Sequence, residues 1–291
     1  MQRADAAMYR AKQQGRNRID VFDEAQRRAA AERLAVRHDL RSASAQGQLH
    51  VHYQPEFALD DGHLVGVEAF VRWDHPRRGM LDAAAFLPLA DQDGVVHGIG
   101  DVVLDAALTQ AKRWRDAIAP GLVVGINISD AELFGADLLD RVGDALAQAS
   151  LPASALRIDV EENTLMLDPS TALAVLTGLK ALGVGLAMDG FGIGNTSLAF
   201  LRRFPVDSVR ISPLQIAGLD SGAADGPDAT VVRGIVRLAR TFGMQVTAVG
   251  IETDTQLAAA RTLGCDSVQG YLLGRPVAAD DLPFGPAPLS I

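Results

Sequence analysis

The chain has 291 residues, of which 27 are basic and 36 are acidic, so its formal net charge is −9. This balance argues against a DNA- or RNA-binding protein, because neutralising a phosphate backbone takes clustered Lys and Arg. The single Cys265 excludes an internal disulfide framework, and no uncharged stretch approaches the length of a membrane span. The sequence therefore predicts a cytoplasmic protein without membrane insertion.

The first 45 residues differ in pattern from the rest of the chain. Residues 3–14 predict a helix with Ala4, Ala7 and Met8 on one face, and residues 19–22 predict a short strand. One helix and one strand cannot bury a core alone. We interpret residues 1–23 as the tail of an upstream domain, 24–45 as a connecting helix, and 46–291 as the main domain.

The main domain alternates apolar, β-branched runs with helical ones. The predicted strands are Leu49 to Gln54, Leu64 to Trp73, Leu122 to Ile128, Leu156 to Val160, Val184 to Met188, Val206 to Ile211, Gln245 to Val249 and Ser267 to Tyr271. The predicted helices are Gly100 to Ala117, Ala131 to Ala149, Ser170 to Leu182, Ser197 to Arg203, Thr230 to Phe242 and Thr255 to Leu263.

This alternation predicts an α/β fold, a closed (β/α)₈ TIM-like barrel. Only residues 60–63 separate the first two strands, which is too few for a helical crossover. We therefore expect those two strands to form an antiparallel hairpin, which makes the start of the barrel irregular.

Polar side chains gather at the predicted strand ends, where active sites of such barrels lie. Glu68, Asn127, Asp159 and Asp189 would bring four oxygen donors from four strands to one mouth. Oxygen ligands of this kind suit Mg²⁺ or Ca²⁺ better than zinc.

From roughly Leu49 to Pro276 the sequence resembles the EAL domain, a barrel family that hydrolyses cyclic di-GMP. The motifs that match in order and spacing are Tyr53-Gln54-Pro55, Glu68 with Arg72 and Trp73, Asn127-Ile128-Ser129, Asp189 with Gly192 and Gly194, and Gln269-Gly270-Tyr271. Residues 4–18 similarly resemble the closing helix of a GGDEF (diguanylate cyclase type) domain. The resemblance implies a parent protein that carries both domains in tandem.

By this resemblance, a first metal ion in active members is held at the positions of Glu68, Asn127, Asp159 and Asp189. The groups implied for the second metal and its water are replaced, by Gly190, Arg210, Ser212 and Val249. Two-metal hydrolysis needs both ions, and the loss of a positioned acid or base removes about 10²–10⁴ in rate. The replacements predict a degenerate domain that is not an enzyme.

The resemblance assigns nucleotide binding to six positions, which are Gln54, Phe70, Val71, Arg72, Gln269 and Pro276. Arg72 is expected on a phosphate and Gln54 on a guanine edge. Phe70 replaces the signature leucine and remains apolar. We expect no required cofactor, with one Mg²⁺ at the four oxygen donors as the alternative. Glu162 either anchors the loop after Asp189 or faces solvent.

The sequence thus predicts an inactive cyclic di-GMP receptor that signals to a protein partner. The combination is similar to FimX-like regulators of type IV pili and twitching motility, some of which engage PilZ-domain proteins, so a PilZ-type partner is expected. Two alternatives stay open. One is a slow phosphodiesterase that yields linear pGpG, and the other is an interaction module that binds no nucleotide.

Overall fold

The computed structural model describes residues 35–90, 95–192, 202–221 and 226–285. The predicted tail at 1–23 and the first part of the predicted connecting helix lie outside these ranges. Residues 35–43 of that connection are helical, and they bury Val36, Leu40 and Ala43 in the same core as the barrel. The domain boundaries themselves stay a prediction.

The sheet closes into a barrel of eight strands, as the sequence predicts. Its strands are β1 (Leu49–Ala58), β2 (Leu64–His75), β4 (Val123–Asn127), β5 (Leu156–Glu161), β6 (Gly185–Phe191), β7 (Ser208–Ile211), β8 (Gln245–Val249) and β9 (Ser267–Gln269). From β2 to β9 neighbouring barrel strands are parallel. Strand β1 runs the other way and pairs with β2 on one side and β9 on the other.

The two joints of β1 differ in extent. The β1–β2 hairpin runs from the pair Leu49 and Trp73 to the pair Phe57 and Leu64. The β1–β9 joint has only Phe57 paired with Val268 and Ala58 paired with Ser267. After β9 the chain returns along β1, where Tyr53 and Val277 exchange backbone hydrogen bonds of 2.7 and 3.0 Å.

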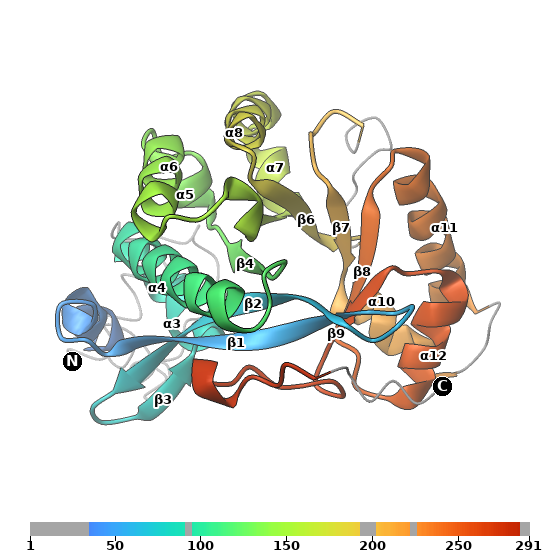
Figure 1. Ribbon diagram of the computed structural model, residues 1–291, viewed down its shortest axis with the longest axis horizontal. Helices are drawn as coiled ribbons and strands as arrows, with labels where there is room; N and C mark the ends of the chain where they lie inside the picture. The colour runs from blue at the N-terminus through green and yellow to red at the C-terminus, as the bar shows by residue number, and fades with distance from the viewer. Residues whose placement is uncertain (1–34, 91–94, 193–201, 222–225, 286–291) are drawn as a thin grey trace, which may run out of the picture.

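Helices cover the outside of the parallel strands (Figure 1). The α-helices are α3 (Ala83–Ala90), α4 (Val95–Ala117), α5 (Asp130–Leu133), α6 (Leu138–Ala149), α7 (Glu162–Leu167), α8 (Pro169–Leu182), α10 (Pro213–Ala217), α11 (Pro227–Thr241) and α12 (Asp254–Leu263). Short 3₁₀ turns occur at η2 (Ala153–Ala155), η3 (Gly218–Ser221) and η4 (Ala279–Asp281).

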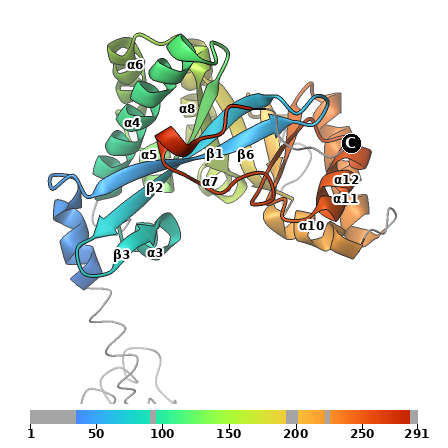
Figure 2. The same ribbon diagram turned by 60° about the horizontal axis from the view of Figure 1, so that its bottom comes forward.

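Several elements differ from the sequence prediction. The single helix expected over 131–149 is two, α5 and α6, and the helix expected at 197–203 lies mostly outside the described residues. Strand β3 (Gly79–Asp82) and helix α3 were not predicted. Within the part of the chain that the structure describes, strand β3 pairs only with β2, and Figure 2 shows it beside α3 at one end of the molecule. Phe86 of α3 packs edge-on against Trp73 of β2, so this addition shares the core.

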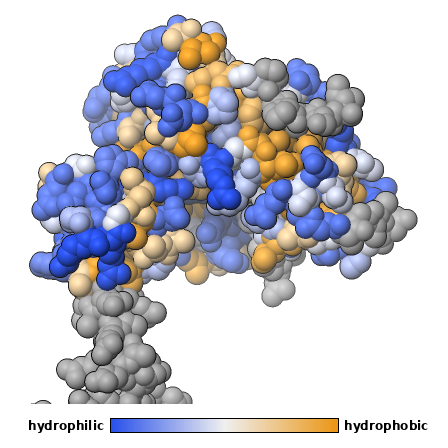
Figure 3. Space-filling view, turned by 90° about the horizontal axis from the view of Figure 1, so that it is seen from below, coloured by the Kyte–Doolittle hydropathy of each residue, from blue (hydrophilic) through white to orange (hydrophobic). Residues whose placement is uncertain are grey.

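The surface is mixed in character. Figure 3, seen from below, shows hydrophobic residues grouped near the middle of that face with hydrophilic residues around them. Within the described ranges, no helix combines the length and the apolar character that crossing a membrane requires.

Candidate functional site

The inside of the barrel is lined with polar and charged side chains. Alternate residues of a strand face the same side, so Gln54 and Glu56 of β1 face inward together, as do Arg157 and Asp159 of β5. The inward set is Gln54, Glu56, Glu68, Arg157, Asp159, Arg210, Thr247, Ser267 and Gln269, and all of them except Arg157 are less than one tenth exposed. Barrel interiors of this class are usually filled by branched aliphatic residues, so this layer marks the site.

Asn127 stands at the last position of β4 and is exposed at the mouth. The chain after it is fixed by a capping box, in which the Ser129 side chain accepts from the Glu132 amide and Glu132 accepts from the Ser129 amide. Asn127 Nδ2 donates to Glu68 Oε1 at 2.6 Å. The β4–α5 turn therefore holds this amide against the signature glutamate.

Asp189 is aimed at the mouth by an irregularity in β6. The β6–β7 register shifts between Met188 and Phe191, and Gly190 has a φ of +67°. Such a bulge re-aims the neighbouring side chain, and the left-handed φ favours glycine. Glu162 is 4% exposed and accepts a 3.1 Å hydrogen bond from the Gly192 amide. It therefore anchors the loop after Asp189, which is the first of the two roles expected for it, and does not face solvent.

Two guanidinium groups sit among the carboxylates. Arg210 Nη2 contacts Glu68 Oε2 at 2.5 Å, and its Nη1 contacts Glu56 Oε2 at 3.0 Å. Arg210 Nε lies 3.6 Å from Asp159 Oδ2 and 3.5 Å from Asp189 Oδ1.

Arg157 makes the second set of contacts. It holds both oxygens of Asp159, at 2.7 and 3.0 Å, and reaches Glu56 Oε2 at 2.9 Å. Glu56 also accepts from Thr247 and Ser267. The result is a continuous ion-pair network that crosses the barrel.

The network shifts the ionisation of its members. Burial raises the pKa of Glu68, and the nearby Asp159 and Asp189 add to this, against the opposing effect of Arg210. Burial likewise raises the pKa of Asp189. Glu56 behaves differently, because Arg157 and Arg210 overcome its burial and bring its pKa down to about 2.

The predicted nucleotide-binding residues lie in two groups. Gln54 and Gln269 meet across the β1–β9 joint, where Gln269 Nε2 donates to Gln54 Oε1 at 3.3 Å. Gln269 Oε1 also accepts from Arg210 Nη2, and Gln54 Nε2 donates to Gly274 O at 2.8 Å. The half-buried Pro276 belongs to the same returning segment as Gly274.

Phe70 and Arg72 share the inward face of β2 with Glu68. The Arg72 guanidinium lies 5.8 Å from the Phe70 ring centre, and its Nε pairs with Asp82 at 3.0 Å. Val71 lies on the opposite face of the strand and is buried in the core, so only its backbone is near this group.

Ser212 and Val249 are two of the residues that replace groups implied for the second metal, and both lie at element ends. The Ser212 hydroxyl accepts from the Leu214 amide and begins α10. Val249 ends β8 and is half-buried. Neither side chain offers a charge to the mouth.

The residues present do not fit a divalent ion at the four predicted ligands. Both Asp159 oxygens are held by Arg157, and the Glu68 oxygens by Asn127 and Arg210. Arg210 Nε, buried and without a hydrogen bond, points between Asp159 and Asp189. A cation there would have to displace a guanidinium.

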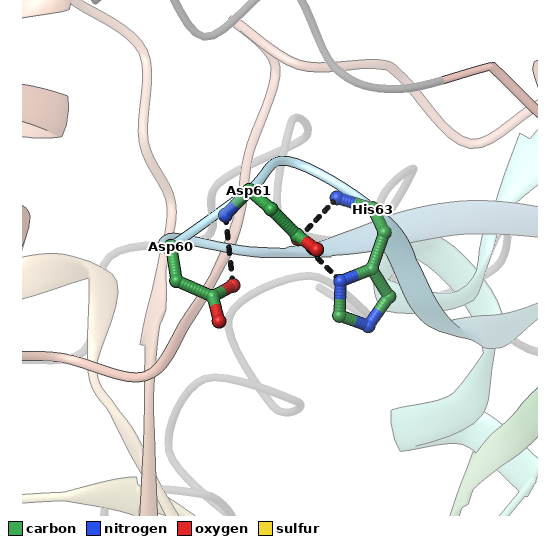
Figure 4. Close-up of side chains that lie close together, drawn as sticks. All are labelled: Asp60, Asp61 and His63. Atoms are coloured by element: carbon green, nitrogen blue, oxygen red, sulfur yellow. Dashed lines mark hydrogen bonds and ion pairs between the residues drawn. The ribbon is translucent and has the colours of Figure 1, made fainter.

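A compact acidic group occurs elsewhere. Among the described residues, the one set of three His, Cys, Asp or Glu side chains whose ligand atoms all lie within 4.8 Å of one another is Asp60, Asp61 and His63. All three are exposed on the β1–β2 turn, at the other end of the barrel, and the hydrogen bonds of their side chains join them to one another (Figure 4).

Two cavities flank the network. One of about 390 Å³ adjoins the mouth, where Phe70 and Asn127 share its lining with apolar residues of α3 and α4. The other, of about 890 Å³, opens at the amino ends of the parallel strands and reaches Glu56 and Arg157 from below.

Glu56 and Arg157 were missed by the sequence analysis. The available signal was their spacing of two residues from Gln54 and Asp159, which places them on the same inward faces. Their pairing joins positions 101 residues apart, and no local pattern reveals it.

The chain belongs to the EAL domain family, since the model of that family matches residues 37–276. It is 42% identical over 279 residues to the bifunctional diguanylate cyclase/cyclic di-GMP phosphodiesterase MucR of Pseudomonas aeruginosa, covering 96% of this chain and 40% of that protein. It is 36% identical over 277 residues to the cyclic di-GMP phosphodiesterase NbdA of the same organism, covering 95% and 35%. The chain thus spans less than half the length of either relative.

Solved structures agree with this assignment. The phosphodiesterase PaMucR in complex with c-di-GMP is 40% identical, with a TM-score of 0.81 over 86% of this chain and 100% of that one. The FimX EAL domain from Pseudomonas aeruginosa has a TM-score of 0.76 at 22% identity, covering 87% and 99%. At that identity the likeness to FimX concerns the fold alone.

The prediction that the chain is not an enzyme is wrong, because relatives as similar as MucR and NbdA are named as phosphodiesterases. That prediction counted the groups that Gly190, Arg210, Ser212 and Val249 replace and left out what Arg210 itself contributes. In the folded barrel Arg210 supplies a fixed positive charge among the carboxylates, and such a charge can stabilise a reacting phosphoryl group.

Proposed function

We propose that the barrel mouth binds cyclic di-GMP. The observation that carries this proposal is the meeting of Gln54, Gln269 and Arg210 at the carboxyl ends of the strands, with Arg72 and Phe70 beside them. Amides suit the edge of a guanine, and a guanidinium suits a phosphate. The 40% identical PaMucR structure, described as a c-di-GMP complex, supports the same ligand.

The charges support a ligand with two phosphates. An acidic mouth alone would repel a dianion, but Arg210 and Arg157 lie within the carboxylate cluster and offset it. Arg72 lies on the inward face of β2, and its partner Asp82 is largely exposed. An ion pair this open to solvent is weak, so a phosphate can replace Asp82 as the partner of Arg72.

The cavity beside the mouth is of a suitable size. Its volume of about 390 Å³ falls within the range of roughly 300–1,000 Å³ typical of ligand pockets. Phe70 lines it with an aromatic ring on which a base can stack. Val71 can contribute through its backbone, and Pro276 borders the mouth from the returning segment.

Titration calorimetry of the purified chain with cyclic di-GMP tests this function. We expect binding at micromolar concentrations, with at least a tenfold loss of affinity in Arg72→Ala. The matched control is Arg261→Ala, an exposed arginine beside the cavity at the opposite end of the barrel, and it should bind within twofold of the wild type. Absence of heat at tens of micromolar wild-type protein would refute the proposal.

Hydrolysis of the phosphodiester to linear pGpG is the second candidate. It is favoured by the names of the relatives, two of which are phosphodiesterases. Arg210 would stabilise the phosphoryl charge. Glu161, whose pKa is raised by burial and by Asp189, is a candidate proton carrier at the mouth. Chromatography of the incubated ligand measures pGpG directly, and Glu161→Gln is expected to lower its rate of formation about tenfold or more.

Two finer assignments come from the resemblance. Residues 1–23 would be the end of a GGDEF-type domain, which the naming of MucR as a bifunctional cyclase supports. A protein partner of the PilZ type, with a role in type IV pili, would receive the signal. Pull-down of a candidate PilZ protein with and without cyclic di-GMP tests that partner and separates it from a nucleotide-independent interaction module.

A further inference from the structure

Arg210 occupies the centre of the barrel. It is the third residue of β7, and its side chain is 1% exposed. The guanidinium contacts Glu56, Glu68 and Gln269 by hydrogen bonds. Its Nε faces Asp159 and Asp189 at 3.6 and 3.5 Å. One side chain therefore contacts the four carboxylates of Glu56, Glu68, Asp159 and Asp189.

Arg157 supplies the second positive charge that balances these carboxylates, and it lies nearer the amino ends of the parallel strands. Its Nε and Nη2 bind the two oxygens of Asp159 in a bidentate pair, and its Nη1 reaches Glu56. Bidentate pairs of this geometry are among the stronger ion pairs between side chains. The oxygens of Asp159 are thus used within the protein and are not free to coordinate an ion.

The charges can be counted directly. The carboxylates of Glu56, Glu68, Asp159 and Asp189 face two guanidiniums, so half of their negative charge is already balanced by the chain. An Arg guanidinium stays protonated at any ordinary pH. A divalent ion brought among these oxygens would meet two fixed positive charges at close range.

We propose that Arg210, supported by Arg157, is the resident cation of this mouth, so that cyclic di-GMP binds without a divalent ion. The proposal rests on the nucleotide-binding function above. It assigns to a side chain the charge compensation that four oxygen donors would otherwise obtain from a metal. It follows that removing metal leaves the affinity for nucleotide unchanged, while removing Arg210 creates a need for metal.

The first test compares nucleotide binding by calorimetry in excess EDTA and in millimolar Mg²⁺. We expect dissociation constants within twofold of each other for the wild type. A loss of tenfold or more in EDTA would overturn the proposal while leaving cyclic di-GMP binding intact. Absence of binding in both buffers would instead refute the proposed function, and the second test then decides alone.

The second test uses Mn²⁺ alone, followed by electron paramagnetic resonance. The background variant is Asp61→Ala with His63→Ala, which removes the exposed cluster on the β1–β2 turn. In this background we expect no bound Mn²⁺ at millimolar concentration, and one bound Mn²⁺ after Arg210→Met. Bound Mn²⁺ that disappears on Asp189→Asn, in a background that keeps Arg210, would overturn the proposal.

Circular dichroism checks the fold of Arg210→Met, because this change leaves buried carboxylates uncompensated. A folded Arg210→Met protein that gains no Mn²⁺ and keeps its affinity in EDTA would also overturn the proposal. If Arg210→Met does not fold, the two measurements on protein that keeps Arg210 decide the question. Arg261→Ala, remote from the mouth, serves as the matched control and should behave as the wild type.

Discussion

At the scale of single residues, the stability of the barrel depends on charges that the chain itself pairs. Glu56 is buried yet ionised, because Arg157 and Arg210 both contact its carboxylate. Breaking a buried pair by removing one partner is costly, since the other charge is left unpaired. Glu56 is therefore a stabilising residue although it lies below the mouth.

The pH dependence of this contribution has a definite sign. The folded-state pKa of Glu56 is about 2, below its ordinary value of 4.5. The carboxylate therefore stabilises the fold above pH 4.5, and the contribution is lost as the pH falls toward 2. We expect Glu56→Gln to lose on the order of 3 kcal/mol of unfolding free energy at pH 7.

Urea unfolding between pH 7 and pH 3 measures this difference. The gap between wild type and Glu56→Gln should narrow as the pH falls. Glu252→Gln, an exposed carboxylate on the loop after β8, is the control and should differ from wild type by less than about 0.5 kcal/mol. A gap that stays constant over this range would contradict the role assigned to the Glu56 charge.

At the scale of elements, the mouth is positioned by close backbone contacts as well as by side chains. Gly270 follows β9, and a Cβ atom added to it would lie 2.1 Å from the carbonyl oxygen of Ile251. The segment after β9 is therefore pressed against the loop after β8. This contact fixes the chain next to Gln269, at the carboxyl end of β9, and the returning segment that carries Gly274 and Pro276 begins there.

Gly270→Ala is expected to destabilise the protein by roughly 2–3 kcal/mol, as overpacking in a close contact does. It should also weaken nucleotide binding, because Gln269 would shift. The matched control is Gly143→Ala in α6, where an added Cβ meets nothing within 4 Å. That change should stabilise the helix by about 0.5–1 kcal/mol. Thermal unfolding of both variants distinguishes them, and equal effects would contradict this account.

At the scale of the whole molecule, the narrow β1–β9 joint is the weak point of the barrel. Two residue pairs close it, and Gln54 and Gln269 meet across it near the mouth. A ligand that contacts both amides would link β1 to β9 and so stabilise this joint. Opening of such a region is measurable by amide hydrogen exchange.

We expect cyclic di-GMP to slow amide exchange in residues 53–58 and 267–277 by severalfold. Peptides from α6, on the far side of α4 from β1, serve as the control and should not change. Hydrogen exchange with mass spectrometry, with and without ligand, makes the measurement. Uniform slowing across the chain would mean that the ligand stabilises the fold without acting at the joint.

The overall topology could be predicted because it depends on local patterns. Alternating strand and helix runs predicted the parallel barrel, and the short connection between the first two strands predicted the antiparallel hairpin, which is confirmed. Strand β3 was missed because it has four residues. Helix α3 was missed because its eight residues are almost all apolar and include Pro88, so they show no amphipathic period.

The site was predictable only in part, for a physical reason. Motif spacing placed Glu68, Asn127, Asp159 and Asp189 at one mouth, and the structure brings them to neighbouring strand ends. It could not reveal that Arg157 and Arg210 fill the space between them, because Arg157 reaches Glu56 from 101 positions away and Arg210 reaches Glu68 and Glu56 from 142 and 154 positions away. The change in charge balance follows from folding, and it alters what the same four residues can bind.

The polar filling of the barrel has a thermodynamic consequence. Exposing apolar surface on unfolding raises the heat capacity, whereas exposing polar surface lowers it. A barrel packed with Glu56, Glu68, Arg157, Asp159 and Arg210 should therefore unfold with a smaller heat-capacity increment than an aliphatic barrel of the same length. The free energy of unfolding would then vary less with temperature, so the binding site should stay folded over a wider range of temperature.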